Sequence, residues 1–464
     1  MIRKKQNTIM KRTSHKLFQT GKIWQNTIFN LVVLSLASCS SAPTLSKVPF
    51  DRYEGKGVFS PYTFSLNDSS LKPPLPSLHK EDESSNLNYL NILVIPVSFD
   101  GGNLSKEELE YCYNGPVDYD QSVTDIFKSN SNGKCLLRFA IADTAVEKRP
   151  DTFDPYAFPS DFLPRWLEEN EVLYPMEKFD SDDSGGYDCI ILEDVSKTHS
   201  IDVNGFYPPN IDKVDGLILI DDSSSGVIAH EIGHALGLPD TYESFVEEGY
   251  GKVHHLPLGS VFVMDGAKTA FTDFEKWVLS WEEPNFFAEK ELTYTLSEDH
   301  PCLFYPVIGN TGNPYGEYLV FSYYDSRNPF MPGFINYGDE IGVYITHVDG
   351  RLYDKENHCF ASSPSKNVSW AFTNHREGKI EGLTNHPQQS ILYNDASDYD
   401  YIAKKESSGE WLLTTVSLFK DGVTFNPNRD YLLYGEDNSH TEQFGYSVAF
   451  SEEDDHGMKI TFTE

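Results

Sequence analysis

The sequence is poor in cysteine. Its 464 residues include six cysteines, at positions 39, 112, 135, 189, 302 and 359. Those that follow Cys39 are widely spaced and odd in number, so they indicate neither a disulfide framework nor a cysteine-based zinc site. One bridge remains open, but its partners cannot be read from the spacing.

Basic residues are also scarce, with 37 lysines and arginines against 71 aspartates and glutamates and a formal net charge of −34. Such a surface repels nucleic acid and anionic lipid head groups, so neither is an expected partner. The charge suits a soluble extracellular protein. The many carboxylates are compatible with calcium binding or with solubility alone.

Long apolar runs are missing beyond the first 40 residues. Residues 1–22 are basic, and the apolar run at 28–38 is too short to span a membrane comfortably, which is the layout of a secretory signal. The run ends in Leu36-Ala37-Ser38-Cys39, which resembles the bacterial lipobox and implies lipid attachment to Cys39. A plain signal peptide or a short membrane anchor is the alternative. We therefore expect the protein to be secreted, or to lie on the extracellular face of a bacterial cell membrane and to touch that membrane only through a lipid anchor.

The chain is too long for one ordinary core, and its texture changes along its length. Residues 1–38 are the predicted signal peptide, and residues 39–88, rich in Ser, Pro and charge, are a tether or a pro-segment. Residues 89–286 form the predicted catalytic domain, and residues 287–464 one or two β-rich, sandwich-like domains. The predicted fold class is therefore α+β.

Apolar and β-branched runs predict the individual elements. In the catalytic domain we expect strands at 91–99, 135–141, 187–192 and 214–220, a helix that begins at 122 and another at 226–236. In the β-rich region we expect strands at 317–324, 341–347, 411–419, 431–434 and 458–462.

The chemistry concentrates in the run His230-Glu231-Ile232-Gly233-His234 on the second helix. His230 and His234 are four residues apart, so both imidazoles leave one face and can bind one metal ion. A bound zinc lowers the pKa of water to about 7, and Glu231 is placed to take that proton and pass it to a leaving amine. The pattern predicts a catalytic zinc with Glu231 as general base. The alternative is a buried helix with two core histidines.

A catalytic zinc takes three protein ligands and keeps one position open. Gly237 can adopt a positive φ and turn the chain out of the helix, which brings Asp240 back toward the ion. Asp240 is therefore the predicted third ligand. Glu243, Glu247 or Glu248 replaces it if the chain re-enters as a helix.

The motif HExxHxxGLPD at His230–Asp240, followed by Met264 in the turn Val263-Met264-Asp265-Gly266, resembles the metzincin clan. Within that clan the sequence looks most like the immune inhibitor A family of bacterial zinc metallopeptidases. Further likeness to that family lies at 122–137, 179–195, 274–281, 317–349 and 447–463. The resemblance implies a metzincin-like zincin catalytic domain, a hydrophobic base formed by Met264 beneath the zinc, and structural calcium.

The sequence departs from the metzincin pattern at two positions. The third ligand in metzincins is usually a histidine, whereas Asp240 stands here. Many metzincins carry a tyrosine two residues after the methionine, whereas Gly266 stands here. A transition-state donor is therefore unassigned, with Tyr242, His254 and His255 as candidates beside the alternative of a solvated loop.

Oxygen-bearing residues follow one another at 180–188, with Asp180, Asp182, Ser184 and Asp188 at spacings like the start of a calcium loop. The bidentate acid twelve positions into such a loop is missing. A structural calcium ion and a solvated acidic turn are both compatible with the run.

Together these patterns predict a monomeric, secreted, lipid-anchored zinc endopeptidase whose substrates are extracellular proteins or peptides. A catalytically idle surface adhesin or binding module on the same fold is one alternative. A zinc amidase or deacetylase is another. The intact Glu231 argues against the idle relative, since a binding module has no use for that carboxylate.

Overall fold

The computed structural model describes the chain from residue 87 onward in stretches. These are residues 87–102, 104–115, 122–180, 185–197, 201, 203–207, 211–221, 223–236, 238, 240–241, 243–247, 251–255, 258, 260–279, 281–308, 317–332, 340–349, 389–391, 418–425, 444–453 and 457–464, with short strand segments at 56–57, 60–61, 80–82, 353–354, 359–360, 402–403, 432–433 and 442–443. The predicted signal peptide, Cys39 and most of the tether lie outside the described residues, as do Asp182, Ser184, Gly237 and Tyr242.

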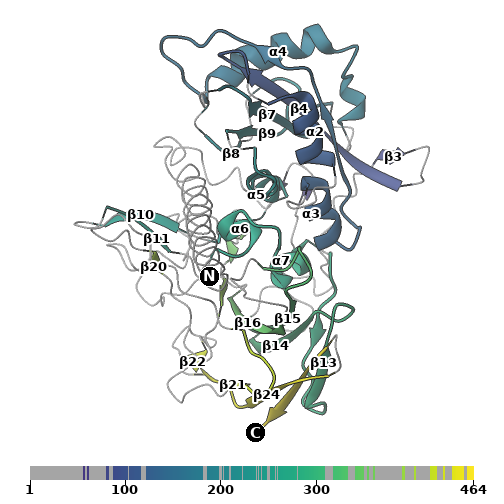
Figure 1. Ribbon diagram of the computed structural model, residues 1–464, viewed down its shortest axis with the longest axis vertical. Coiled ribbons are helices and arrows are strands. Elements are labelled where there is room, and N and C mark those ends of the chain that lie inside the picture. Colours follow the sequence, from purple (N-terminus) through teal and green to yellow (C-terminus); the bar gives the residue numbers. More distant parts are fainter. Residues whose placement is uncertain are drawn as a thin grey trace, which may run out of the picture.

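The described part of the chain is a mixed α/β structure with sheets and few helices (Figure 1). The prediction that the chain contains both helices and sheets is thereby confirmed, whereas the metzincin-like and sandwich-like details stay predictions. No helix in that part is both long enough and apolar enough to cross a membrane. The domain boundaries stay a prediction.

A seven-stranded sheet organises the first half of the molecule. Its long central strand β4 pairs in parallel with β5, β6 and β7, while β9 continues the parallel order beyond β7. Strands β3 and β8 are antiparallel to their neighbours. The strand bounds are β3 Lys80–Asp82, β4 Leu87–Ser98, β5 Leu137–Ile141, β6 Ala145–Val146, β7 Ile190–Asp194, β8 Gly205–Tyr207 and β9 Leu217–Ile220.

Both faces of this sheet are covered, which explains why the run at 91–99 is apolar almost without interruption. Ile92 and Val94 of β4 point into a core shared with three helices, α2 (Lys106–Asn114), α3 (Val123–Asn130) and α5 (Ser225–Ala235). Leu93 and Ile95 point into the opposite core, against α4 (Phe158–Asn170). Figure 1 shows α4 on one side of the sheet and α5 on the other.

Two helices, α2 and α4, were not predicted from the local sequence pattern. The α2 helix has a complete capping box, in which Ser105 accepts from the Glu108 backbone and the Glu108 side chain accepts from the Ser105 backbone. The α4 helix contains Pro164, which speaks against a helix interior. Burial of Phe162, Leu163 and Trp166 in the core overrides that penalty.

Two further sheets fill the second half of the molecule. The five-stranded sheet has the order β12-β14-β15-β16-β19, and the four-stranded sheet the order β13-β25-β24-β21. The strand bounds are β12 Asn285–Phe286, β13 Thr293–Leu296, β14 Cys302–Ile308, β15 Glu317–Asp325, β16 Ile341–Asp349, β19 Gln389–Ile391, β21 Thr424–Phe425, β24 Ser447–Glu452 and β25 Met458–Thr463. The remaining described pairs are short: β1 Lys56–Gly57 with β2 Ser60–Pro61, β10 Glu243–Glu247 with β11 Gly251–His255 and β20 Ile402–Ala403, β17 Tyr353–Asp354 with β18 Cys359–Phe360, and β22 Leu432–Leu433 with β23 Glu442–Gln443.

Strand β15 is buried along its whole length because it separates two cores. Leu319 and Phe321 point into the core that the five-stranded and four-stranded sheets share. Tyr318 and Val320 point into the core of the first half. There the ring of Trp277, from α7 (Asp273–Val278), lies 5.5 Å from the ring of Tyr318. One face of the five-stranded sheet therefore packs against the same hydrophobic core as α5.

Candidate metal centre

The helix α5 carries the HExxH run and is buried on all sides. Its N-terminus is capped by Ser224, whose side chain accepts the backbone N–H of Val227 at 3.4 Å. Residues 226–235 are all buried, since α5 lies between the seven-stranded sheet and α6 (Val263–Gly266) (Figure 1). After α5 the backbone N–H of Leu238 donates to the carbonyl of Gly233 at 3.0 Å, which turns the chain out of the helix.

The structure brings His230, His234 and Asp240 together. The two Nε2 atoms lie 3.1 Å apart. Asp240 Oδ1 lies 3.0 Å from Nε2 of His230 and 3.3 Å from Nε2 of His234. The three side chains form the only group of three or more potential metal ligands among the described residues.

Hydrogen bonds at the far side of each ring fix the tautomers. Nδ1 of His230 lies 2.9 Å from the carbonyl oxygen of Val263, and Nδ1 of His234 lies 2.8 Å from that of Leu238. A carbonyl oxygen only accepts, so each Nδ1 carries the hydrogen and each neutral Nε2 presents a lone pair. Two nitrogen lone pairs and a carboxylate oxygen thus face one point, which is a favourable arrangement only around a cation.

Positive charge at this point favours the ionised carboxylate. Burial on its own raises the pKa of Asp240, but in the metal-free centre the charge and hydrogen bonds of protonated His234 and His230 outweigh it and hold that pKa well below its usual range. A bound cation would supply the positive charge while both Nε2 atoms stay unprotonated. The side chain of Asp240 is 27% exposed, whereas those of His230 and His234 are 4% and 9% exposed. The centre is therefore enclosed by the protein on the histidine side and is reached by solvent beside Asp240.

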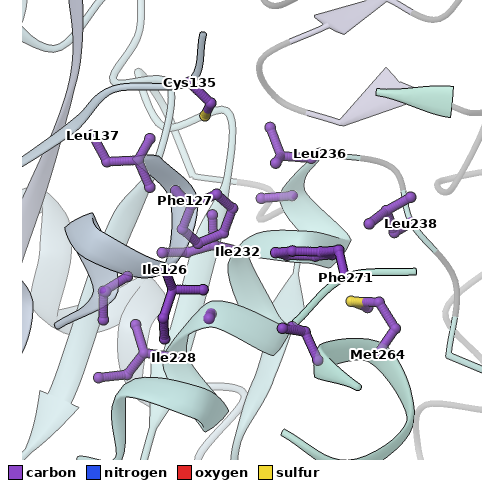
Figure 2. Close-up of a cluster of buried hydrophobic side chains, with 14 of the residues drawn as sticks. Ile126, Phe127, Cys135, Leu137, Ile228, Ile232, Leu236, Leu238, Met264 and Phe271 are labelled. Atoms are coloured by element: carbon purple, nitrogen blue, oxygen red, sulfur yellow. The ribbon is translucent and has the colours of Figure 1, made fainter. Parts of the chain in front are cut away.

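Met264 lies in α6, directly beneath α5. A Cβ built on Gly233 would stand 2.4 Å from its Sδ, so only a glycine lets the helix approach the methionine this closely. Figure 2 shows Met264 beside Phe271 in the buried cluster that also holds Ile232 of α5 and Phe127 of α3. The carbonyl of Met264 accepts the backbone N–H of Thr241 at 3.2 Å.

The structure explains why no tyrosine follows Met264 by two residues. A Cβ built on Gly266 would stand 2.4 Å from Ser260 Oγ and 2.6 Å from the Ser260 carbonyl oxygen. Any side chain at this position would therefore collide with the loop before α6. Of the candidate donors, His254 and His255 are described only as backbone positions on β11, so the donor stays unassigned.

Glu231 is completely buried on α5, next to His230. The alternative ligands Glu243 and Glu247 are described only as backbone positions on β10, and Glu248 lies outside the described residues. Among these four candidates, Asp240 is the one whose side chain is described, and it lies beside both imidazoles. Its role as third ligand stays a prediction.

The predicted calcium residues are only partly described. Asp180 and Asp188 are both buried, and Asp180 Oδ2 accepts the backbone N–H of Gly185 at 2.9 Å. The two form no ligand cluster among the described side chains. The calcium ion stays a prediction.

Sequence reasoning missed the side chain of Asp265, to which it assigned no role. This carboxylate is completely buried at the end of the turn that holds Met264. Burial raises its pKa to about 7, although hydrogen bonds from the backbone of Phe262 and Ser260 lower it. An ionisable residue directly after the methionine of an apolar turn was the signal that could have drawn attention to it.

Comparison with known protein families agrees with this geometry. Residues 192–284 match the family model described as the immune inhibitor A peptidase M6, catalytic domain. The matched stretch runs from β7 to just beyond α7 and contains the three clustered residues, Glu231 and Met264. The resemblance to the immune inhibitor A family is thereby confirmed, and this stretch is related to a peptidase domain. No curated protein matches the chain.

Proposed function

We propose that this protein is a zinc-dependent endopeptidase, with zinc held by His230, His234 and Asp240. The observation that carries the proposal is the convergence of two imidazole Nε2 atoms and one carboxylate oxygen, with both Nδ1 atoms bound to backbone carbonyls. The peptidase family match over residues 192–284 supplies the reaction class.

The donor set fits zinc. Zinc in proteins prefers tetrahedral coordination with Zn–N bonds of about 2.0–2.1 Å, which places two ligand atoms about 3.3 Å apart. The three ligand atoms here are separated by 3.0, 3.1 and 3.3 Å. Three protein ligands are also the number found in catalytic zinc sites, which keep one position for water or substrate. When bound, zinc would polarise a substrate carbonyl and lower the pKa of a water molecule to about 7.

In the proposed reaction Glu231 acts as general base and then as general acid. Its carboxylate accepts a proton from the attacking water and afterwards delivers that proton to the leaving nitrogen of the cleaved peptide bond. Complete burial of Glu231 keeps this carboxylate out of bulk water. His230 and His234 keep their Nδ1 protons on backbone carbonyls throughout, which preserves the orientation of both rings.

We extend the proposal to the rest of the molecule. The catalytic part follows the metzincin arrangement, with Met264 as hydrophobic base, and the two later sheets form a sandwich-like region. The basic N-terminus, the short apolar run and Cys39 support secretion and lipid anchoring, so the substrates are proteins or peptides outside the cell. We also propose a monomer.

The test compares the full chain, purified in detergent, with the variants Glu231→Gln and Glu291→Gln. Glu291 is an exposed glutamate remote in sequence from α5 and serves as the matched control. We expect about one zinc per chain in all three proteins, and casein cleavage at least about 100-fold slower in Glu231→Gln alone. Zinc binding without cleavage by the parent, after removal of any pro-segment, would contradict the peptidase function and favour a binding module.

A further inference from the structure

We propose that Asp265 is a positioning residue that holds two of the three metal ligands in place through the backbone of the turn around Met264. The proposal rests on the zinc centre proposed above. The hydrogen bonds of Asp265 go to the backbone of its own loop, so its positioning action passes through that loop.

The carboxylate of Asp265 closes this loop with two hydrogen bonds to backbone N–H groups, which together form the Asp265 clasp. Its Oδ2 accepts the backbone N–H of Ser260 at 2.6 Å, and its Oδ1 accepts that of Phe262 at 2.8 Å. Asp265 is completely buried, so no solvent competes for these bonds. Both oxygens are used, and residues 260–265 are thereby tied into one closed unit.

The same unit carries the two carbonyls that support the ligands. The carbonyl of Val263 accepts from Nδ1 of His230 at 2.9 Å. The carbonyl of Met264 accepts the backbone N–H of Thr241, the residue after Asp240, at 3.2 Å. Asp265 therefore acts on His230 and on Asp240.

His234 is supported differently. Its Nδ1 lies 2.8 Å from the carbonyl oxygen of Leu238, which follows closely after the end of α5 and does not belong to the turn around Met264. Loss of the clasp should therefore misplace His230 and Asp240 and leave the orientation of His234 unchanged.

The backbone around the turn is strained, which makes the clasp necessary. Ser260 and Ala267, on either side of α6, have φ angles of 58° and 51°. Non-glycine residues adopt this left-handed conformation at a cost in free energy, and they keep it only where the surroundings enforce it. Without the hydrogen bond to Asp265, the backbone at Ser260 would leave this conformation. The carbonyls of Val263 and Met264, which support His230 and Asp240, would then shift.

Asp194 offers a matched control. It is also a buried aspartate, and its two oxygens accept the backbone N–H groups of Ser196 at 2.9 Å and Ile201 at 2.7 Å. Its loop follows β7, whereas Nδ1 of His230 is bonded to Val263 in the turn around Met264. Asp194→Asn and Asp265→Asn each remove one acceptor and place an amide N–H₂ against a backbone N–H.

The experiment uses the full chain and both variants. It measures the thermal midpoint of each protein, and it measures the zinc Kd of each by competition with a chelator. We expect both substitutions to lower the thermal midpoint of the zinc-free protein. We expect only Asp265→Asn to raise the zinc Kd, by about 10- to 100-fold, as is usual for loss of a group that orients a metal ligand. An equal zinc Kd in Asp265→Asn and Asp194→Asn would overturn the proposal.

A measurement on the unsubstituted protein covers the case in which Asp265→Asn does not fold. Because coupling between two sites is reciprocal, zinc must strengthen the clasp as much as the clasp strengthens zinc binding. The backbone amides of Ser260 and Phe262 should exchange hydrogen more slowly with zinc than without it, relative to those of Ser196 and Ile201. Unchanged exchange would overturn the proposal.

The outcomes separate this proposal from the proposed function. A parent chain that binds zinc but cleaves nothing contradicts the peptidase function, and the zinc Kd of the variants still decides the role of Asp265. A parent chain that binds no zinc overturns both.

Discussion

Replacing Gly233 by alanine tests the close approach of α5 to Met264. The added Cβ would stand 2.4 Å from Met264 Sδ and 3.2 Å from its Cε, which is closer than non-bonded atoms tolerate. Met264 is completely buried, so it yields only by displacing its neighbours in the core. Overpacking of this kind costs about 2 kcal/mol, and alanine regains about 1 kcal/mol through its helix propensity. We expect Gly233→Ala to reduce the free energy of unfolding by about 1 kcal/mol.

The sign of the effect should reverse when the methionine is shortened. Met264→Ala removes the colliding atoms and by itself costs about 2–5 kcal/mol through the cavity that it leaves. In that background Gly233→Ala meets no obstacle and should increase the free energy of unfolding by about 1 kcal/mol. The coupling between the two substitutions is then about 2 kcal/mol, within the range for residues in contact.

The assay is urea unfolding of the zinc-free full chain, followed by tryptophan fluorescence, because Trp277 and Trp281 belong to the same core as Met264. Gly445→Ala is the control, since a Cβ there would meet nothing within 4 Å. If Gly233→Ala shifts the urea midpoint in the same direction in both backgrounds, Met264 does not lie beneath α5 as described.

Two further predictions concern the metal and pH. Zinc at 1,000 times its Kd stabilises a protein by about 4 kcal/mol, so a chelator should lower the thermal midpoint of the parent chain. The chelator should leave the thermal midpoint of Asp240→Ala unchanged. If a chelator still lowers the midpoint of this variant, the third ligand is a glutamate and not Asp240. Burial raises the pKa of Glu275 to about 7, although hydrogen bonds from Thr272 and Gln389 lower it. Its contribution to stability is therefore present below its unfolded-state pKa near 4.5 and is lost as the pH rises through 7. The thermal midpoint of Glu275→Gln should rise relative to the parent between pH 5 and pH 8, and a difference that does not change with pH would contradict a buried, titrating carboxylate.

Local patterns predicted the elements that carry the site because those elements are formed by short-range forces. The helix at 226–236 is observed as Ser225–Ala235, one residue from the prediction at each end, since Ser224 caps it and apolar residues flank the histidines. The helix that begins at residue 122 is observed as Val123–Asn130 with Ser122 as N-cap. The strand at 91–99 is observed as β4, Leu87–Ser98.

Other elements could not be read from local pattern. Pro164 hid α4, and only the burial of its aromatic face against the sheet shows why a helix persists there. In the later half, the strands at 317–324 and 341–347 are observed as β15 and β16. Of the strand at 411–419 only the last two residues lie within the described part of the chain. The sequence did not indicate that β15 belongs to the cores of both halves, because pairing partners far apart in the chain decide it.

The sequence by itself determined the identity and spacing of the proposed metal ligands. Two histidines four apart on a helix must share a face, and a glycine followed by an aspartate offers the return of a third ligand. Tertiary structure alone decided which carbonyls bind the two Nδ1 atoms, why Gly233 and Gly266 can carry no side chain, and what Asp265 holds. The physical reason is range: helical periodicity acts over four residues, whereas the contact between His230 and Val263 spans 33 residues and exists only once α6 has packed beneath α5.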